Sequence, residues 1–277
     1  MPKIRISTAQ IKVSNSVEKN GVEIRKQIKI GKLQGSNIVH FCEGALSGYT
    51  KSQLINYQRI DFPKIRIEIE KIKLLCKELN IWAVIGSAHE LSKSHRPHNS
   101  LYIISDEGEI INRYDKRKCS HNELTNWYTP GFESCNFEIY GIKFGCILCI
   151  EIQFPQLFIQ AEKEDVDCIL FSSYSREKMF GIQAQGYAAT NNYWISMSVP
   201  ANESEKLPSQ FISPNGEVQN KCRRNCTSII TCEIDTEDEK WKTPIKYAKP
   251  WRRIAREGKI YSEKKVIDKR SKLKTII

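Results

Sequence analysis

The sequence predicts an α/β fold: one domain over residues 1–239, followed by a basic C-terminal tail over residues 240–277. Short apolar runs typical of strands alternate with amphipathic stretches of helical spacing from residue 4 to residue 235. No low-complexity linker and no repeat of fixed period interrupts this alternation. A chain of 277 residues is also long enough to bury one large core.

The first half of the domain contains four predicted strands and two predicted helices. IRISTAQI alternates apolar and polar residues as a half-buried strand does, and residues 63–79 place apolar side chains on one helical face. DEGEI, at residues 106–110, supplies a turn with glycine at the turn position. The strands are expected at 4–11, 37–42, 81–88 and 100–105, and the helices at 17–31 and 63–79.

The second half repeats the alternation and ends in a hairpin. SQFISPNGEV combines two short strand patterns with a Pro-Asn-Gly turn. Because the strands are nearly continuous apolar runs, both faces of the sheet are expected to be covered. Strands are expected at 141–150, 167–173, 193–199 and 227–235, with a short helix after Pro155 and another around 181–192.

The positive charge is concentrated in the tail. Residues 240–277 contain 14 basic and three acidic residues, which accounts for the whole formal charge of +11, and residues 1–239 are neutral. A basic segment can bind nucleic acid electrostatically, but no nucleic-acid-binding motif accompanies this one. We therefore expect the tail to cover an acidic surface of its own or a neighbouring subunit, and we do not expect nucleic acid as a partner.

The cysteines and the N-terminus predict a cytoplasmic protein. No apolar run reaches the length of a membrane span, and MPKIRISTAQ lacks the pattern of a signal peptide. The ten cysteines lie mostly inside apolar runs, which is typical of reduced, buried thiols.

The stretch GCILCIEIQFP, residues 145–155, contains the cysteine of greatest interest. Cys146 and Cys149 are an odd number of positions apart, so an extended strand directs their thiols to opposite faces, and a shared metal is not expected. Cys149 ends the apolar strand just before a turn and a helix. Reacting groups emerge at such strand ends in α/β folds, and exposed backbone N–H groups can stabilise a thiolate there.

Two other stretches place charged residues at strand ends. FCEGALSGY puts Glu43 directly after a buried strand, and NRYDKRKC puts Lys116 just beyond another. Together with Cys149, these stretches resemble the nitrilase, or carbon–nitrogen hydrolase, superfamily. The glutamate motif of that family ends in Gly-Tyr, its lysine follows Tyr-Asp, and its cysteine precedes an acidic residue and Phe-Pro. YTPG at 128–131 and the late hairpin extend the resemblance over roughly residues 4–235.

This resemblance implies a four-layer α-β-β-α sandwich whose subunits pair into a homodimer or a higher homo-oligomer, with the tail reaching across the interface. It also implies a catalytic set of Glu43, Lys116 and Cys149, with Glu123 positioning the substrate. Two positions depart from the common pattern: Lys118 stands where many members carry histidine, and Glu151 where many carry aspartate.

An amide is a poor electrophile, so its hydrolysis needs an activated nucleophile and a stabilised oxyanion. Glu43 is expected to act as general base and then general acid for Cys149, with Lys116 and the backbone N–H of Ile150 binding the oxyanion. Tyr174, which follows a strand end, is expected to border the site. This chemistry needs no cofactor and no metal.

The predicted function is therefore cleavage of a non-peptide C–N bond in a small amide through a thioester. A nitrilase and an N-carbamoyl amide hydrolase of the same superfamily are alternatives. A non-catalytic binding protein that uses the basic tail is the alternative from another class.

Overall fold

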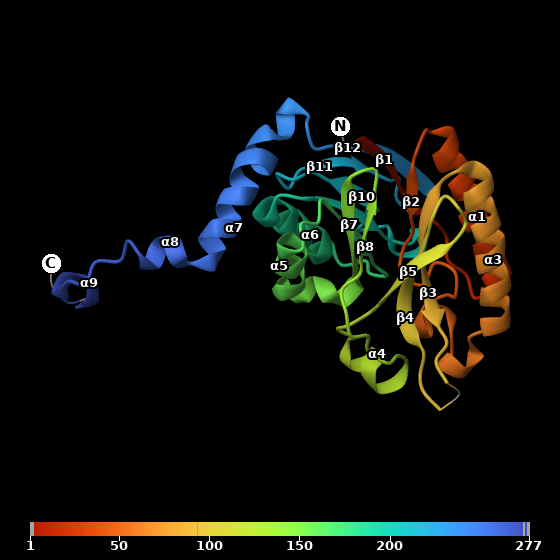
Figure 1. Ribbon diagram of the computed structural model, residues 1–277. Coiled ribbons are helices and arrows are strands. Elements are labelled where there is room, and N and C mark those ends of the chain that lie inside the picture. The colour runs from red at the N-terminus through yellow and green to blue at the C-terminus, as the bar shows by residue number, and fades with distance from the viewer. Residues whose placement is uncertain (1–2, 93, 274, 276–277) are drawn as a thin grey trace.

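The computed structural model describes residues 3–92, 94–273 and 275, and it contains two six-stranded sheets packed face to face (Figure 1). The first sheet has the strands β12 (Ser228–Asp235), β1 (Lys3–Gln10), β2 (Ile38–His40), β3 (Trp82–His89), β4 (His98–Ile104) and β5 (Ile110–Asp115), in that order. The second has β11 (Val218–Lys221), β10 (Gln210–Ile212), β9 (Trp194–Ser198), β8 (Cys168–Ser172), β7 (Ile142–Leu148) and β6 (Asn136–Ile139).

Helices cover the outer face of each sheet. α1 (Val17–Leu33) and α3 (Phe62–Leu79) lie on the first sheet, and α5 (Pro155–Lys163) and α6 (Lys178–Asn191) lie on the second (Figure 1). The N-termini of α1 and α3 are capped by Ser16 and Asp61, whose side chains accept hydrogen bonds from backbone N–H groups of the first turn. Short helical segments connect the layers: α2 (Thr50–Gln53), η1 (Tyr57–Arg59), α4 (His121–Asn126), η2 (Cys149–Gln153) and η3 (Ala201–Glu203).

Three apolar clusters fill the three spaces between these four layers. Neighbouring strand residues point to different clusters: Ile38 packs between the sheets, whereas Val39 packs under α1 and α3. Trp194 lies in the cluster between the sheets, and Phe158 lies in the cluster under α5 and α6. The predicted α-β-β-α sandwich is therefore confirmed.

The structure differs from the sequence-based prediction at two places near Cys149. The strand predicted over 141–150 ends at Leu148, because the backbone of Cys149 has a φ of +45° and turns into η2. The sequence analysis also missed β6 and α4. α4 has six residues, fewer than the window in which helical spacing can be recognised, and β6 has four, the shortest run in which strand alternation can be recognised.

A chain of hydrogen bonds joins the two sheets beneath the strand ends. Ser172 Oγ donates to the carbonyl oxygen of Phe41 at 2.8 Å, so it accepts from Nε2 of His40 at 2.7 Å. Nδ1 of the neutral ring then accepts from Ser196 Oγ at 2.9 Å, and Thr8 Oγ1 donates to Ser196 at 2.6 Å. Burial lowers the pKa of His40 and keeps its ring neutral, so the ring links β2 to β8 with one donor and one acceptor nitrogen.

The tail docks on the core through its basic side chains. It consists of η4 (Glu239–Trp241), the π-helix η5 (Lys242–Ala248), α7 (Lys249–Glu257), α8 (Lys259–Ser262) and α9 (Lys269–Lys272). Cations of α7 meet the C-terminal ends of α5 and α6, where helix dipoles and unpaired carbonyl groups favour positive charge. These contacts are Lys249 to Val166 O, Arg252 to Ala189 O, Arg253 to Glu162 and Asp165, and Arg256 to Glu162 and Thr190 O.

Beyond α7, the chain carrying α8 and α9 extends away from the sandwich (Figure 1). Within the described residues, no helix combines the length and the apolar character that a membrane crossing requires.

Candidate active site

Glu43 lies in the turn that follows β2, with its side chain fully buried. The turn passes directly over β3 at Gly86. A Cβ atom at that position would lie 2.1 Å from the carbonyl oxygen of Cys42 and 2.9 Å from the Cα of Glu43. Only glycine allows this approach, so Gly86 sets the depth at which the carboxylate sits.

Lys116 directly follows β5 and is also fully buried. Its backbone N–H donates to the carbonyl oxygen of Asn99, and its carbonyl oxygen accepts from the N–H of Gly131 in the YTPG loop, both at 2.8 Å. Lys116 Nζ donates to Glu43 Oε1 at 2.8 Å and to Glu123 Oε1 at 2.7 Å. The structure thus brings these three predicted residues into one hydrogen-bonded group.

Glu123 is fixed from two sides. It is the third residue of α4 and forms a capping box with Ser120, whose backbone N–H donates to Glu123 Oε2 at 2.8 Å. The hydroxyl of Tyr49 donates to Glu123 Oε1 at 3.1 Å. One carboxylate therefore caps a helix, orients Lys116 and contacts a tyrosine at the edge of the site.

Asn99, at the start of β4, completes the group and was missed by the sequence analysis. Its side-chain N–H donates to Glu43 Oε1 at 2.7 Å. Glu43 Oε1 therefore accepts from both Asn99 and Lys116, whereas buried Glu43 Oε2 has no hydrogen-bond partner among the described residues. A buried polar atom without a partner is costly, and such atoms often mark catalytic groups. The only sequence signal for Asn99 was an amide at the beginning of an otherwise apolar strand.

Cys149 sits at the sharp turn between β7 and η2, and 7% of its surface is exposed. A φ of +45° is strained for a residue with a side chain, and such strain concentrates at functional sites. Ser173 Oγ, just past β8, donates to Cys149 Sγ at 3.5 Å. Burial and the Glu43 carboxylate raise the pKa of the thiol, against the opposing effect of Lys116. The resting cysteine is therefore a neutral thiol.

The charges of the group are set by burial and by each other. Burial raises the pKa of Glu43 above the ordinary value of a glutamate, although Lys116 opposes this. Burial acts to lower the pKa of Lys116, but the Glu43 and Glu123 carboxylates outweigh it and raise that pKa well above its ordinary value. Lys116 in turn keeps the pKa of Glu123 low despite its burial. The ammonium stays charged, and Glu43 is the group poised to exchange a proton.

Glu151 ties the cysteine turn to the lysine segment. Its fully buried carboxylate accepts from the backbone N–H groups of Leu148, Arg117 and Lys118 at 2.8, 2.8 and 3.0 Å, and from the Tyr114 hydroxyl at 2.7 Å. These four bonds link the end of β7 to the residues that flank Lys116. The sequence analysis noted Glu151 as a departure from the family pattern but gave it no role.

A cavity of about 410 Å³ opens beside this group. Glu123 and Tyr49 line it, as does Tyr174, whose ring stacks on that of Tyr49 with 4.7 Å between centroids. A volume of this size suits a small ligand. Ile150 is the second residue of η2, where a backbone N–H has no acceptor within the helix.

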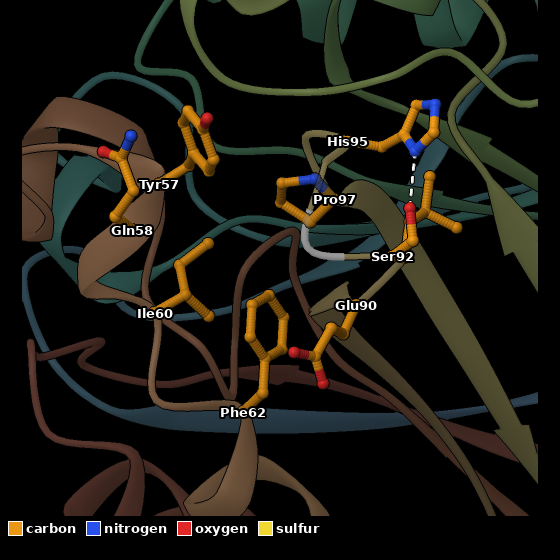
Figure 2. A pocket seen from close by; sticks show the side chains of 9 residues that line it. Tyr57, Gln58, Ile60, Phe62, Glu90, Ser92, His95 and Pro97 are labelled. Atoms are coloured by element: carbon orange, nitrogen blue, oxygen red, sulfur yellow. Dashed lines mark hydrogen bonds between the residues drawn. The ribbon is translucent and has the colours of Figure 1, made fainter.

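Two other features lie apart from this group. A cavity of about 200 Å³ between η1 and the loop after β3, shown in Figure 2, is lined by Tyr57, Phe62 and Pro97 and by none of the predicted catalytic residues. Cys146 packs between the two sheets, whereas Cys149 packs under α5 and α6, so their thiols do not converge.

Comparison with known proteins identifies the family of this chain and relatives that share its fold. The family model described as carbon-nitrogen hydrolase matches residues 3–242. The glutamine-dependent NAD(+) synthetase of Acinetobacter baylyi is 25% identical over 256 residues, which cover 87% of this chain and 46% of that protein. This chain therefore spans about half the length of that relative. The deaminated glutathione amidase of Dictyostelium discoideum is 21% identical over 260 residues, covering 84% of this chain and 88% of that protein.

Among solved structures, an amidase from Nesterenkonia sp. shares the fold, with a TM-score of 0.73 at 14% identity over 83% of this chain and 90% of that one. One structure of that amidase shows covalent addition of the acetamide moiety of fluoroacetamide at its active-site cysteine. The family match extends over most of the sequence, and the fold agrees with it. The chain belongs to the carbon–nitrogen hydrolase family.

Proposed function

We propose that this protein is a cysteine hydrolase that cleaves the C–N bond of a small amide through a thioester and releases ammonia or an amine. The observation that carries the proposal is the partnerless, buried Oε2 of Glu43, in a carboxylate whose other oxygen is held by Lys116 and Asn99. An anchored carboxylate with one free oxygen is suited to receive a proton from Cys149 and return it.

In the first half of the reaction, Glu43 takes the Cys149 proton while the sulfur attacks the amide carbonyl carbon. The ammonium of Lys116 and the backbone N–H of Ile150 stabilise the oxyanion, and each such donor contributes about 100-fold or more in rate. Glu43 then gives its proton to the departing nitrogen, and the C–N bond breaks. The acyl group stays on the sulfur as a thioester.

In the second half, Glu43 removes a proton from water, which attacks the thioester carbonyl carbon. The C–S bond breaks, the carboxylic acid leaves, and the thiolate recovers its proton from Glu43. Glu123 keeps Lys116 protonated and oriented throughout, and its position on the cavity wall also favours contact with the substrate.

The proposal is tested by measuring ammonia release from a panel of small amides and by mass spectrometry of quenched enzyme. We expect an acyl adduct on Cys149 and no ammonia release by Cys149→Ala. Cys146→Ala is the matched control because Cys146 lies three residues away in another part of the core. Full activity of Cys149→Ala, or an adduct on another residue, would refute the proposal. Matched nitriles and N-carbamoyl compounds in the same panel separate the two related activities.

The contacts and exposed residues of the tail favour a role in pairing subunits over a role in binding nucleic acid. Lys249 and three arginines of α7 already contact the ends of α5 and α6. The opposite side of the tail exposes Tyr247, Trp251, Ile254 and Tyr261, here called the tail face, with exposed fractions from 49% to 61%. Contiguous exposed apolar residues mark interaction sites. We therefore include in the proposal a homodimer that buries the tail face.

We also assign the protein to the cytoplasm. All ten cysteines are free, and seven of them are buried. A reducing compartment keeps such thiols, including Cys149, available. Fluorescence microscopy of the tagged full chain tests this assignment.

A further inference from the structure

Two consecutive serines at the end of β8 contact different parts of the molecule. Ser172 is the last residue of β8, and Ser173 directly follows it. Neighbouring residues of an extended chain face opposite sides of a sheet. Ser172 Oγ faces the first sheet, where it donates to the carbonyl oxygen of Phe41 at 2.8 Å. Ser173 therefore faces the other side, which is the side on which Cys149 packs.

The hydroxyl group of Ser173 contacts the sulfur of Cys149. Ser173 Oγ donates to Cys149 Sγ at 3.5 Å, and the Ser173 side chain is fully buried. In the part of the chain that the structure describes, Cys149 Sγ accepts a hydrogen bond from no other side chain. The bond acts to lower the pKa of the thiol, whereas burial and Glu43 raise it. The hydroxyl is thus aimed at the atom that the proposed reaction uses as its nucleophile.

The backbone of Ser173 is anchored, so its hydroxyl group is held in place. Its N–H donates to the carbonyl oxygen of Ser198, the last residue of β9, at 2.9 Å. Ser198 Oγ in turn donates to the carbonyl oxygen of Ala9 in β1, at 2.6 Å. These bonds fix the position of Ser173 relative to both sheets. A donor that is fixed before the reaction needs no reorganisation when charge develops on its acceptor.

The charge on the sulfur changes in both halves of the proposed reaction. Removal of the thiol proton by Glu43 leaves a thiolate, and attack on the amide converts the thiolate into a neutral thioester. Hydrolysis of the thioester releases the thiolate again. Burial disfavours the charged sulfur, and Lys116, the cation that favours it, already donates to Glu43 and Glu123. A second group that stabilises the thiolate would therefore lower the barrier of both halves.

From this geometry we infer that Ser173 is a further catalytic residue, whose hydroxyl group stabilises the Cys149 thiolate through a hydrogen bond in both halves of the reaction. This inference rests on the proposed function. A hydrogen bond to a charged acceptor is about twice as strong as one between neutral groups, so Ser173 stabilises the thiolate more than the thiol. The hydroxyl keeps its own proton throughout, and the thiol proton still goes to Glu43.

Ser173→Ala tests the inference through the kinetic constants of amide hydrolysis. Loss of a hydrogen bond to a charged group should lower kcat/KM about 10-fold. We expect kcat to fall by the same factor and KM to stay unchanged, because the bond strengthens only as the thiolate forms. A rise in KM at constant kcat would overturn the inference.

Ser213→Ala is the matched control for this variant. Ser213 is also fully buried and directly follows a strand of the second sheet, β10. Its hydroxyl group bonds to Asn215 and to the carbonyl oxygen of Glu217, so its removal should leave kcat and KM unchanged. Equal losses of activity in Ser173→Ala and Ser213→Ala would overturn the inference, because they would show a general effect of removing a buried hydroxyl.

Alkylation of Cys149 by iodoacetamide is a second measurement, which needs no turnover. The thiolate is the reactive form, so a thiolate fraction about 10-fold smaller in Ser173→Ala slows the reaction. A thiolate of higher pKa is also the better nucleophile, which offsets part of this loss, and we expect alkylation about 3-fold slower at pH 7. Peptide mass spectrometry follows each cysteine separately: exposed Cys226 should react as in the wild type, and buried Cys168 should stay unlabelled. Partial unfolding would instead speed alkylation of Cys149 and label Cys168, and that result would assign Ser173 a structural role in place of a catalytic one.

The two measurements separate this inference from the proposed function. If no amide of the panel is hydrolysed but Ser173→Ala slows the alkylation of Cys149 alone, the proposed hydrolysis fails and stabilisation of the thiolate by Ser173 stands. If the wild type hydrolyses amides through an adduct on Cys149, and Ser173→Ala equals it in kcat, KM and alkylation rate, the inference fails and the hydrolase stands.

Discussion

At the scale of single residues, the protonation state of Glu43 is expected to set the pH dependence of the reaction. Burial raises its pKa above the ordinary 4.5 of a glutamate, and a general base works only when deprotonated. We therefore predict that kcat/KM falls as the pH drops through a value above 4.5. Glu43→Gln is expected to lose about 100- to 10,000-fold in kcat/KM, together with this acid limb, in a pH–rate profile. The control Glu107→Gln lies in an exposed turn and should keep the wild-type kcat/KM and the acid limb. An unchanged acid limb in Glu43→Gln would assign it to another group.

A second prediction at this scale concerns Glu151. Each of its two carboxylate oxygens accepts two hydrogen bonds. In Glu151→Gln an amide N–H₂ replaces one acceptor and faces two donors. We expect a loss of about 3 kcal/mol in the free energy of unfolding, measured by urea denaturation. Glu138→Gln, at the exposed position of β6, is the control and should change stability little. Equal effects of the two substitutions would contradict the anchoring role of Glu151.

At the scale of elements, His40 links the sheets and makes stability depend on pH. Burial lowers its pKa to about 3, from an ordinary 6.5. Between these two pH values the imidazole is protonated in the unfolded chain but stays neutral in the folded protein. The free energy of unfolding therefore falls as the pH drops through this window. The expected slope is about 1.4 kcal/mol per pH unit. His40→Gln should remove that slope from urea unfolding measured between pH 7 and pH 4, whereas exposed His121→Gln should not. The same slope in both variants would exclude His40 as its source.

The elements also show where sequence patterns suffice. Strand alternation and helical spacing predicted the long elements. The resemblance of three motifs to the carbon–nitrogen hydrolase family predicted Glu43, Lys116 and Cys149, and in the structure Glu43 and Lys116 lie close enough to Cys149 to affect the pKa of its thiol. Asn99 was missed because its role depends on β4 running antiparallel to β3 and β5, which brings its first residues to the ends of β2 and β5. A pairing between strands leaves no mark in the local sequence, so partners across strands need the structure.

At the scale of the whole molecule, the tail has two different sides. One side is rich in arginine and contacts the core, and the opposite side is apolar and exposed. Trp251 and Tyr261 of the tail face have ring centroids 6.3 Å apart, so the apolar surface continues from α7 to α8. A solvent-exposed aromatic pair of this kind suits the centre of a protein interface, where one anchor typically contributes 2 kcal/mol or more.

Trp251→Glu therefore tests the proposed homodimer. We expect the wild-type chain to sediment as a dimer or larger, and Trp251→Glu to dissociate about 30-fold more readily, because 2 kcal/mol corresponds to that factor. The arginines that hold α7 to the core are untouched by the change, so circular dichroism should stay the same. Leu33→Glu is the matched control, since Leu33 is 87% exposed at the end of α1, far from the tail in sequence and on the other sheet. A monomeric wild-type chain at tens of micromolar, or equal dissociation of the two variants, would show that a second copy does not cover the tail face.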